Sequence, residues 1–356
     1  MGSTLPLRAE LRGLTPYGAP MLDVPVRLNV NENPYPPSEA LVAYAAEAAA
    51  DAVRGLNRYP DRDARALRCD LAAYLGHGLD ESRVWAANGS NEIMLQLLQA
   101  FGGPGRTALS FAPTYSMYPE YARATATTWV TGRRDEDFGI ERTHALEQVT
   151  RHQPSVVLLA SPNNPTGTAL PLDLVTALHD SCDGIVVVDE AYAEFRRTGT
   201  PSSLTLLAHH PRLVVVRTMS KAFAFAGARL GYMAGAPDII SAVQVVRLPY
   251  HLSAVTQAVA RVALAHAHEL LAKVEAIRID RDEITQWLRD QGLVVPDSDA
   301  NFVLVGRFAD RHAVWLGLLD RGVLVRETGP EGYLRVTVGT PDEMAAFRSA
   351  IVEVMG

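Results

Sequence analysis

Short apolar runs alternate with longer amphipathic segments through the middle of the chain. The runs are rich in β-branched residues and apolar at successive positions, which is typical of strands buried on both faces of a parallel sheet. The segments between them repeat apolar residues at i, i+3, i+4 and i+7, which indicates helices that cover the sheet. This pattern predicts strands at 83–87, 155–160, 184–189 and 212–217, and helices at 91–101 and 171–180.

The pattern changes toward both ends of the chain. From about residue 237 long helices predominate, notably over 255–290, and strands are expected at 301–306 and 333–339. The first 35 residues are rich in proline and have no clear period, so we expect an arm that packs on another surface. The pattern therefore predicts an arm (1–35), a large α/β domain with a mostly parallel sheet (36–250) and a smaller α/β C-terminal domain (251–356).

Composition narrows the class of protein. The 356 residues are enough for about two domains at roughly 100–200 residues each, and 48% hydrophobic with 21% charged residues is ordinary for a folded chain. A net charge of −7 without long Lys/Arg runs argues against nucleic acid as a partner. No uninterrupted apolar run is long enough to span a membrane and the start lacks the apolar core of a signal peptide, so we expect no membrane partner and a cytoplasmic location. Cys69, Cys182 and the ten histidines show no metal-ligand spacing, so no metal site is expected.

Polar residues and glycines cluster directly after four of the expected strands. Open α/β sheets bind their ligands at the carboxyl ends of the strands, so these clusters are expected to face one ligand. The clusters are NGSNE (88–92), SPNNPTG (161–167), DEAY (189–192) and TMSK (218–221).

A lysine, a strand-end carboxylate, a phenol and a helix N-terminus together indicate pyridoxal 5′-phosphate. Lys221 would attach covalently to its aldehyde. Asp189 would pair with the ring nitrogen, because a nearby carboxylate favours the protonated ring. Tyr192 and Asn164 would both reach the phenolic oxygen of the ring. We therefore expect Lys221, Asp189 and Tyr192 to be the catalytic residues.

The phosphate of this cofactor requires an anion site. The NGSNE turn would present free backbone N–H groups at the start of the next helix, where an anion is stabilised. Ser90, Asn91, Ser220 and Arg229 would complete the phosphate site, Arg229 with a bidentate guanidinium. Tyr115 is expected to lie flat on the ring.

Further motifs carry a resemblance that runs over nearly the whole chain. SPNNPTG and SKAF…GARLGY are specific for the fold-type I pyridoxal-phosphate aminotransferases, which the chain resembles. LTPYG, NENPY and RLPYHLSAVTQ are similar to a narrower branch, the histidinol-phosphate aminotransferases of the actinobacterial kind. The other matching segments are NRYPD (57–61), PTYSMY (113–118), VVDEAYAEF (187–195), DANF (299–302) and YLRVTVGT (333–340).

The resemblance implies features that the residues alone do not. It implies a homodimer with shared active sites, in which Tyr59 of one subunit contacts the cofactor phosphate bound to the other. It implies that Tyr17 covers the substrate, that Asn164 contacts it, and that Arg335 and Arg326 hold its anionic end.

Two segments depart from the pattern of this family. Ala224 and Phe225 stand where Gly and Leu are expected, close to Lys221, and RETGPEGY (326–333) differs from the usual segment between the two arginines. The first departure concerns packing beside the lysine. The second concerns recognition of the substrate.

The activity implied by the resemblance is transfer of an amino group between L-histidinol phosphate and 2-oxoglutarate. In the biosynthetic direction, imidazole acetol phosphate and glutamate react in one step of histidine biosynthesis. The alternatives on the same fold are an aromatic (phenylalanine) aminotransferase and an amino acid phosphate decarboxylase. A transcription factor is disfavoured because no helix-turn-helix module precedes residue 35, and a nicotinamide dehydrogenase because no GxGxxG follows the first strand.

Overall fold

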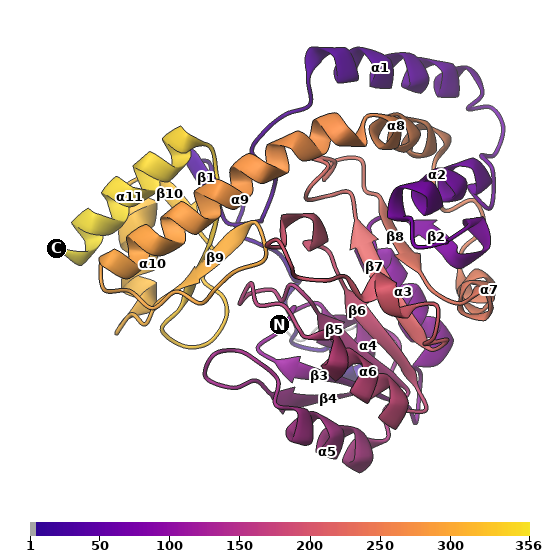
Figure 1. Cartoon of the computed structure of the whole chain (residues 1–356), viewed down its shortest axis with the longest axis horizontal. Coiled ribbons are helices and arrows are strands. Elements are labelled where there is room, and N and C mark those ends of the chain that lie inside the picture. The colour runs from indigo at the N-terminus through magenta and orange to yellow at the C-terminus, as the bar shows by residue number, and fades with distance from the viewer. Residues whose placement is uncertain (1–4) are drawn as a thin grey trace.

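The computed structural model describes residues 5–356, so residues 1–4, the start of the predicted arm, lie outside the described residues. A seven-stranded sheet in the order β2-β8-β7-β6-β5-β3-β4 is the centre of the larger unit (Figure 1). Only β8 runs antiparallel to its neighbours, so the other strands all end at the same edge. The strands are β2 (Val84–Ala87), β3 (Thr107–Ala112), β4 (Thr128–Arg133), β5 (Val156–Ala160), β6 (Ile185–Asp189), β7 (Leu213–Thr218) and β8 (Gly231–Ala234).

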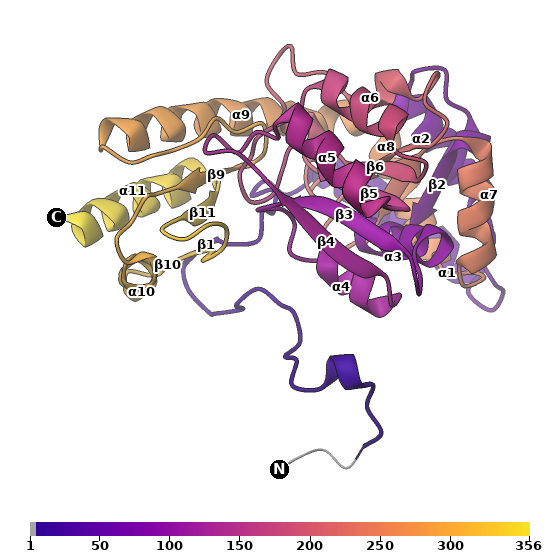
Figure 2. The same cartoon turned by 90° about the horizontal axis from the view of Figure 1, so that it is seen from below.

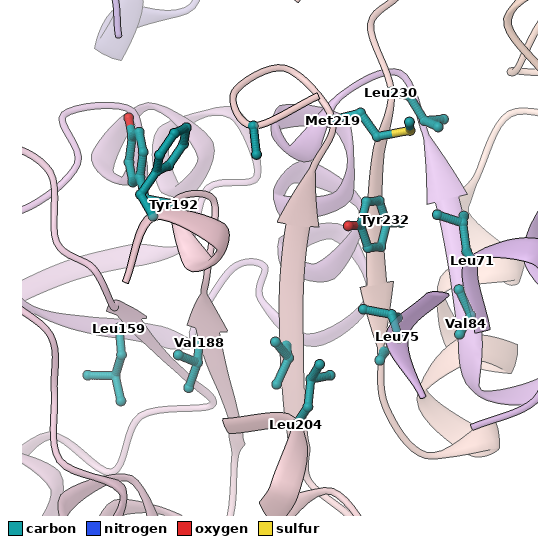
Figure 3. Close-up of a cluster of buried hydrophobic side chains, with 14 of the residues drawn as sticks. Leu71, Leu75, Val84, Leu159, Val188, Tyr192, Leu204, Met219, Leu230 and Tyr232 are labelled. Atoms are coloured by element: carbon teal, nitrogen blue, oxygen red, sulfur yellow. The ribbon is translucent and has the colours of Figure 1, made fainter. Parts of the chain in front are cut away.

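Helices cover both faces of this sheet because successive strand residues point to opposite sides. In β5, Val157 and Leu159 belong to one hydrophobic cluster, whereas Val156 and Leu158 belong to another. The first cluster, partly drawn in Figure 3, lies under α2 (Arg65–Leu75), α5 (Arg142–His152), α6 (Leu172–Ser181) and α8 (Ala254–Ala265). The second lies under α3 (Ser90–Phe101), α4 (Tyr118–Ala124) and α7 (Pro237–Val246). Outside these layers, α1 (Glu39–Arg54) packs along α8, and short 3₁₀ helices are η1 (Ala9–Leu11), η2 (Glu81–Arg83), η3 (Ala193–Phe195) and η4 (Ser203–Leu206).

The smaller unit combines the C-terminal part of the chain with one N-terminal strand. β1 (Val26–Leu28) pairs in parallel with β10 (Val323–Val325), and β9 (Phe302–Val305) pairs antiparallel with β11 (Leu334–Thr337). A single antiparallel bridge between Arg326 and Arg335 joins the two pairs. The core of this unit is completed by α9 (Ala267–Asp290), α10 (Arg311–Asp320) and α11 (Pro341–Met355) (Figure 2).

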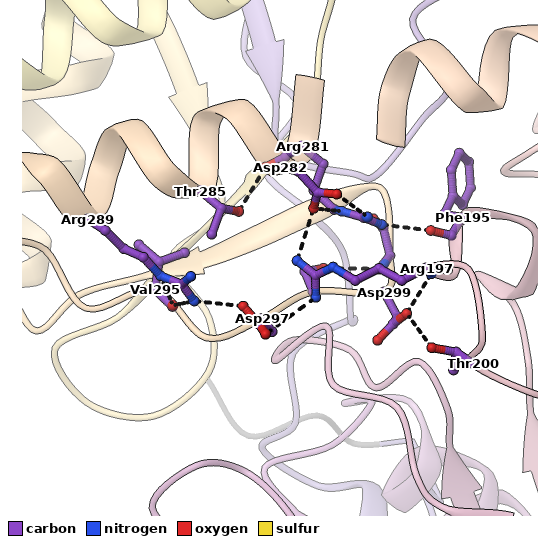
Figure 4. A network of polar contacts seen from close by, with 12 residues as sticks. Phe195, Arg197, Thr200, Arg281, Asp282, Thr285, Arg289, Val295, Asp297 and Asp299 are labelled. Atoms are coloured by element: carbon purple, nitrogen blue, oxygen red, sulfur yellow. Dashed lines mark hydrogen bonds and ion pairs between the residues drawn. The ribbon is translucent and has the colours of Figure 1, made fainter. Parts of the chain in front are cut away.

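A buried arginine of α9 ties the two units together (Figure 4). Arg281 is fully buried and donates to the carbonyl oxygens of Phe195, at 2.6 Å, and Ala300, at 3.3 Å. Nearby, the backbone N–H of Arg197 donates to Asp299 at 2.7 Å. These contacts fix the loop after β6 to the segment that leads into β9.

The predicted strands and the predicted helices at 91–101 and 171–180 are confirmed to within about two residues. The long helical pattern over 255–290 is two helices that meet at His266, whose ring stacks on Tyr44 of α1. Because α8 packs on α1 and α2, we infer that the smaller unit begins in α9. Because β1 pairs with β10, the smaller unit includes β1 as well. The domain limits at 35 and 250 stay a prediction.

No helix in residues 5–356 is long and apolar enough to cross a membrane. Both cysteines are free: Cys182 is buried and Cys69 is exposed.

Candidate active site

A cavity of about 260 Å³ lies at the carboxyl edge of the sheet, bounded by the arm and by the smaller unit. It collects the segments that follow β2, β5, β6 and β7, as the sequence predicts, and also the segment that follows β3, a strand that was not predicted. Every predicted site residue except Tyr59 lines it: Tyr17, Ser90, Asn91, Tyr115, Asn164, Asp189, Tyr192, Ser220, Lys221, Arg229, Arg326 and Arg335.

Lys221 follows β7 and projects into this cavity. Its Nζ donates a hydrogen bond to the carbonyl oxygen of Val30, at 2.9 Å. Burial, with the positive charges of Arg335 and Arg229, lowers the pKa of Lys221 to about 8. The amine is therefore neutral in an appreciable fraction of molecules near neutral pH, as a nucleophile or base must be.

Asp189 ends β6 and has no cationic partner within residues 5–356. Its Oδ2 accepts from the hydroxyl of Tyr118 at 3.0 Å, and its Oδ1 accepts from the backbone N–H of Ala191 at 3.1 Å. Burial raises the pKa of Asp189 to about 6. A buried carboxylate that lacks a cation attracts a positively charged ligand.

Tyr192 lies beyond Asp189 on the same loop. Its hydroxyl oxygen accepts from Nδ2 of Asn31 at 3.0 Å, and its ring packs edge-on against Phe302 at 5.1 Å. Burial raises the pKa of Tyr192, and the hydrogen bond from Asn31 acts in the opposite direction.

The N-terminus of α3 forms an anion site with Arg229. In residues 5–356 the backbone N–H groups of Ser90 and Asn91 make no hydrogen bond within the protein. A Cβ at Gly89, where φ is 82°, would lie 2.7 Å from Nη2 of Arg229, so glycine lets the guanidinium approach the helix end. Ser220 accepts from Arg229 Nη1 at 3.4 Å. Free N–H groups, the helix dipole and a guanidinium together favour a phosphate.

Arg335, in β11 of the smaller unit, is a further buried cation of the cavity. It donates to Oδ1 of Asn164 at 2.6 Å and to the carbonyl oxygen of Asn29 at 2.7 Å. Its Nε is buried without a hydrogen-bond partner in the described chain, and burial lowers its pKa to about 10, so it stays cationic at neutral pH. Arg326 pairs with Arg335 through the backbone and lies in the same cavity wall.

The aromatic residues divide into two groups. Tyr17, half exposed, hydrogen-bonds Ser116 at 2.9 Å across the cavity mouth, and Tyr115 packs edge-on against Tyr118. Tyr59 is 80% exposed and stacks on Tyr250 with ring centroids 4.4 Å apart, outside the cavity.

Sequence reasoning missed several residues that line the cavity or hydrogen-bond a side chain that lines it. Tyr118 and Asn31 lie in motifs that were recognised, PTYSMY and NENPY, but they were given no role. Asn29 and Val30 act through backbone carbonyls, which no residue type signals.

The residues present fit the predicted cofactor. The uncompensated Asp189 suits a protonated ring nitrogen, the Lys221 amine suits an aldehyde, and the free N–H groups of α3 suit a phosphate. Arg335 and Arg326 remain available for an anionic substrate.

Known proteins match the chain over nearly its full length. The model of the family "aminotransferase class I and II" matches residues 24–351. The histidinol-phosphate aminotransferase 3 of Burkholderia lata is 62% identical over 357 residues, which cover 99% of this chain and 96% of that protein. The histidinol-phosphate aminotransferase of Thermobifida fusca is 62% identical over 352 residues, with 99% and 96% covered.

A solved structure of similar fold is the histidinol-phosphate aminotransferase of Sinorhizobium meliloti in complex with pyridoxal-5′-phosphate. The TM-score is 0.83 at 24% identity, and the match covers 93% of this chain and 91% of that one. At this identity the likeness concerns the fold, and it confirms the fold class predicted from the sequence.

Proposed function

The chain belongs to the aminotransferase class I and II family, and on this premise we propose that it transfers an amino group between L-histidinol phosphate and 2-oxoglutarate with pyridoxal 5′-phosphate. The names of relatives 62% identical over 99% of the chain support this substrate. The structural observation that carries the proposal is one cavity that joins a buried amine, a buried carboxylate and two separate anion sites.

The cofactor supplies an electron sink, which acidifies the C–H bond beside the amino group of a bound substrate. Lys221 anchors the aldehyde and, as a free amine, moves the proton of that bond. Asp189 holds the ring nitrogen in its protonated form. Tyr192 and Asn164 bind the phenolic oxygen of the ring, and Tyr115 packs on its face.

The phosphate of the cofactor binds at the start of α3. Ser90, Asn91 and Ser220 donate hydrogen bonds, and Arg229 supplies the charge. These residues belong to the larger unit, whereas Arg326 and Arg335 belong to the smaller one, so cofactor and substrate anions have different binding groups.

Arg335 and Arg326 hold the anionic end of the substrate. Glutamate offers a carboxylate there and histidinol phosphate a phosphate, and a phosphate is large enough to meet two guanidinium groups. Both guanidinium groups belong to residues that line the cavity, which supports this assignment.

We also propose a homodimer with shared sites. Tyr59 is 80% exposed and stacks on Tyr250, and close to these two residues in the chain Leu56 and Leu248 are exposed apolar side chains as well. Such a patch is typical of an interface. The cytoplasmic location stays a prediction.

An absorption titration of purified holoenzyme tests the activity. A cofactor band that bleaches on addition of glutamate or histidinol phosphate, and is restored by 2-oxoglutarate, is the expected result. The matched control is Lys221→Ala, which lacks the covalent anchor and is expected to show neither the same band nor turnover.

Product analysis separates the alternative activities. Phenylalanine as the better amino donor would replace the proposal with an aromatic aminotransferase, and release of carbon dioxide would replace it with a decarboxylase.

A further inference from the structure

The hydrogen bonds around Asn31 define the direction of its amide. Thr337 Oγ1 lies 3.0 Å from both the backbone nitrogen and Oδ1 of Asn31. The Thr337 hydroxyl oxygen accepts from the backbone N–H, and the hydroxyl donates its own proton to Oδ1. The NH₂ group of Asn31 is therefore the end that faces Tyr192.

This direction decides what the phenol of Tyr192 can do. The NH₂ group only donates, so the Tyr192 oxygen accepts from it at 3.0 Å. In residues 5–356 the Tyr192 hydroxyl makes no other hydrogen bond, and Tyr192 lines the cavity. The phenol's own proton is therefore left for an acceptor in the cavity.

The backbone of Asn31 is held in an unusual conformation. Its φ is 57°, a region that few residues other than glycine adopt, and the residue is 1% exposed. Its carbonyl oxygen accepts from Nδ2 of Asn301 at 3.1 Å. A strained conformation held on several sides is more common at functional sites than elsewhere.

The neighbours of Asn31 contact the cavity too. The carbonyl oxygen of Asn29 accepts from Arg335, and that of Val30 accepts from Lys221. Three consecutive residues, which directly continue β1, thus each hold one polar side chain of the site.

We propose that Asn31 is a positioning residue that orients the phenol of Tyr192 as a hydrogen-bond donor into the cavity. This inference rests on the proposed function, because the acceptor is the phenolic oxygen of the cofactor. A phenol that accepts a hydrogen bond from an amide is polarised and donates more strongly. Asn31 thereby stabilises the ionised form of that cofactor oxygen through Tyr192.

The test uses Asn31→Gly, because glycine keeps the positive φ without strain and removes only the amide. We expect the pH midpoint of the holoenzyme's cofactor absorbance to rise by about half a unit to one unit, the equivalent of one neutral hydrogen bond. The dissociation constant of the cofactor is expected to rise by up to about tenfold. Both are measured without turnover.

A double-mutant cycle with Tyr192→Phe distinguishes positioning from general support of the structure. If Asn31 acts through the phenol, Asn31→Gly shifts the midpoint in the wild type and leaves it unchanged in the Tyr192→Phe background. Equal shifts in both backgrounds, or no shift in either, would overturn the inference.

Thr337 supplies a second, independent test. Thr337→Val keeps the shape but removes the hydroxyl that orients the amide, so it is expected to raise the midpoint, and Thr337→Ser is expected to restore it. A wild-type midpoint in Thr337→Val would count against the inference. A wild-type protein without any cofactor band would overturn the proposed function and this inference together.

Discussion

Asp189 and Glu190 are adjacent carboxylates in opposite environments. Glu190 is buried with the guanidinium of Arg217 at 2.7 Å, and that charge lowers its pKa against the effect of burial. Asp189 has only a phenol and one N–H, and burial raises its pKa to about 6. The charge of Glu190 is balanced within the protein, whereas the charge of Asp189 is left for a ligand to balance.

The first prediction follows from the pKa of Asp189. Between about pH 4 and pH 6 the folded protein binds more protons at Asp189 than the unfolded chain does, so the free energy of unfolding falls as the pH rises through this window. Above pH 6 the folded protein carries the full energetic cost of keeping the charged Asp189 carboxylate buried. Asp189→Asn removes the charge, so the cofactor-free variant is expected to be more stable than the wild type at pH 8 by about 1–3 kcal/mol. Urea unfolding at pH 8 and pH 5 measures this, and the gain should be smaller at pH 5.

Glu190→Gln is the matched control. It breaks a buried ion pair and is expected to destabilise the protein by about 3–5 kcal/mol at pH 8. The same sign for both variants would contradict the assignment of Asp189. Asp189→Asn is nevertheless expected to lose most of the turnover, since stability and function are opposed at such a site.

Arg335 and Arg326 differ in how deeply their side chains are buried, and the second prediction follows from this difference. Arg335 is buried, whereas Arg326 is partly exposed, and within residues 5–356 its side chain makes one hydrogen bond, a long 3.4 Å contact to the carbonyl oxygen of Gly18. Arg335→Ala is expected to impair reaction with both glutamate and histidinol phosphate. Arg326→Ala is expected to lower kcat/KM for histidinol phosphate by about one to two decades and to affect glutamate much less, since a lost charge-assisted hydrogen bond is worth about 1.5–3 kcal/mol. An unchanged kcat/KM for histidinol phosphate in Arg326→Ala would refute the role.

At the scale of elements, β2, β5, β6 and β7 were predicted from the sequence, whereas β3, β4 and β8 of the same sheet were not. β5 and β6 are buried along their whole length, and their apolar runs show it. β4 is an edge strand with mostly exposed or half-exposed side chains, so TWVTGR carries no clear signal. The break between α8 and α9 also lacks a glycine or proline, so the sequence carries no signal for it; in the fold, His266 at the break stacks on Tyr44.

The turn after Lys221 gives the third prediction. Ala224 has φ of 54° at the position where the family pattern has glycine. The left-handed conformation destabilises a residue that has a Cβ by about 1–2 kcal/mol, and glycine removes this strain. Glycine also increases the entropy of the unfolded chain, which destabilises the folded protein by about 0.4–1 kcal/mol. Ala224→Gly is therefore expected to raise the free energy of unfolding by about 0.5–1 kcal/mol. Urea denaturation measures the change.

Ala226→Gly provides the comparison two residues along the same turn. Ala226 is not among the residues with positive φ, so glycine there is expected to lower the free energy of unfolding by about 0.4–1 kcal/mol. If both substitutions destabilised the protein equally, this result would show that the backbone of Ala224 is not strained.

At the scale of the whole molecule, the residue range of the arm could be predicted from the sequence, but its contacts in the fold could not. The pairing of β1 with β10 and the hydrogen bonds of residues 29–31 join segments that lie from 161 to 306 positions apart. Such pairings depend on the assembled fold, which local pattern does not contain. The strand-end residues were predictable because parallel strands bring their carboxyl ends to one edge, whatever the rest of the chain does.

The charge of the cavity also emerges only from the assembled molecule. The chain has a net charge of −7, yet Lys221, Arg229, Arg326 and Arg335 all line one cavity. The local potential therefore favours anionic ligands although the whole protein is acidic.

The last prediction concerns the proposed dimer. Tyr59 lies outside the cavity of its own chain and is 80% exposed, so it can serve a site only across a subunit boundary. In a hybrid of the wild type with a chain that carries both Lys221→Ala and Tyr59→Phe, the only intact lysine faces the altered tyrosine. We expect the loss of one hydrogen bond to raise the dissociation constant of the cofactor at that site by up to about tenfold. The matched control places the same two substitutions on different chains, which returns an unaltered tyrosine to the intact lysine and should bind cofactor like the wild type. Equal affinity in the two hybrids would show that Tyr59 does not reach across, because they differ only in which chain carries each change.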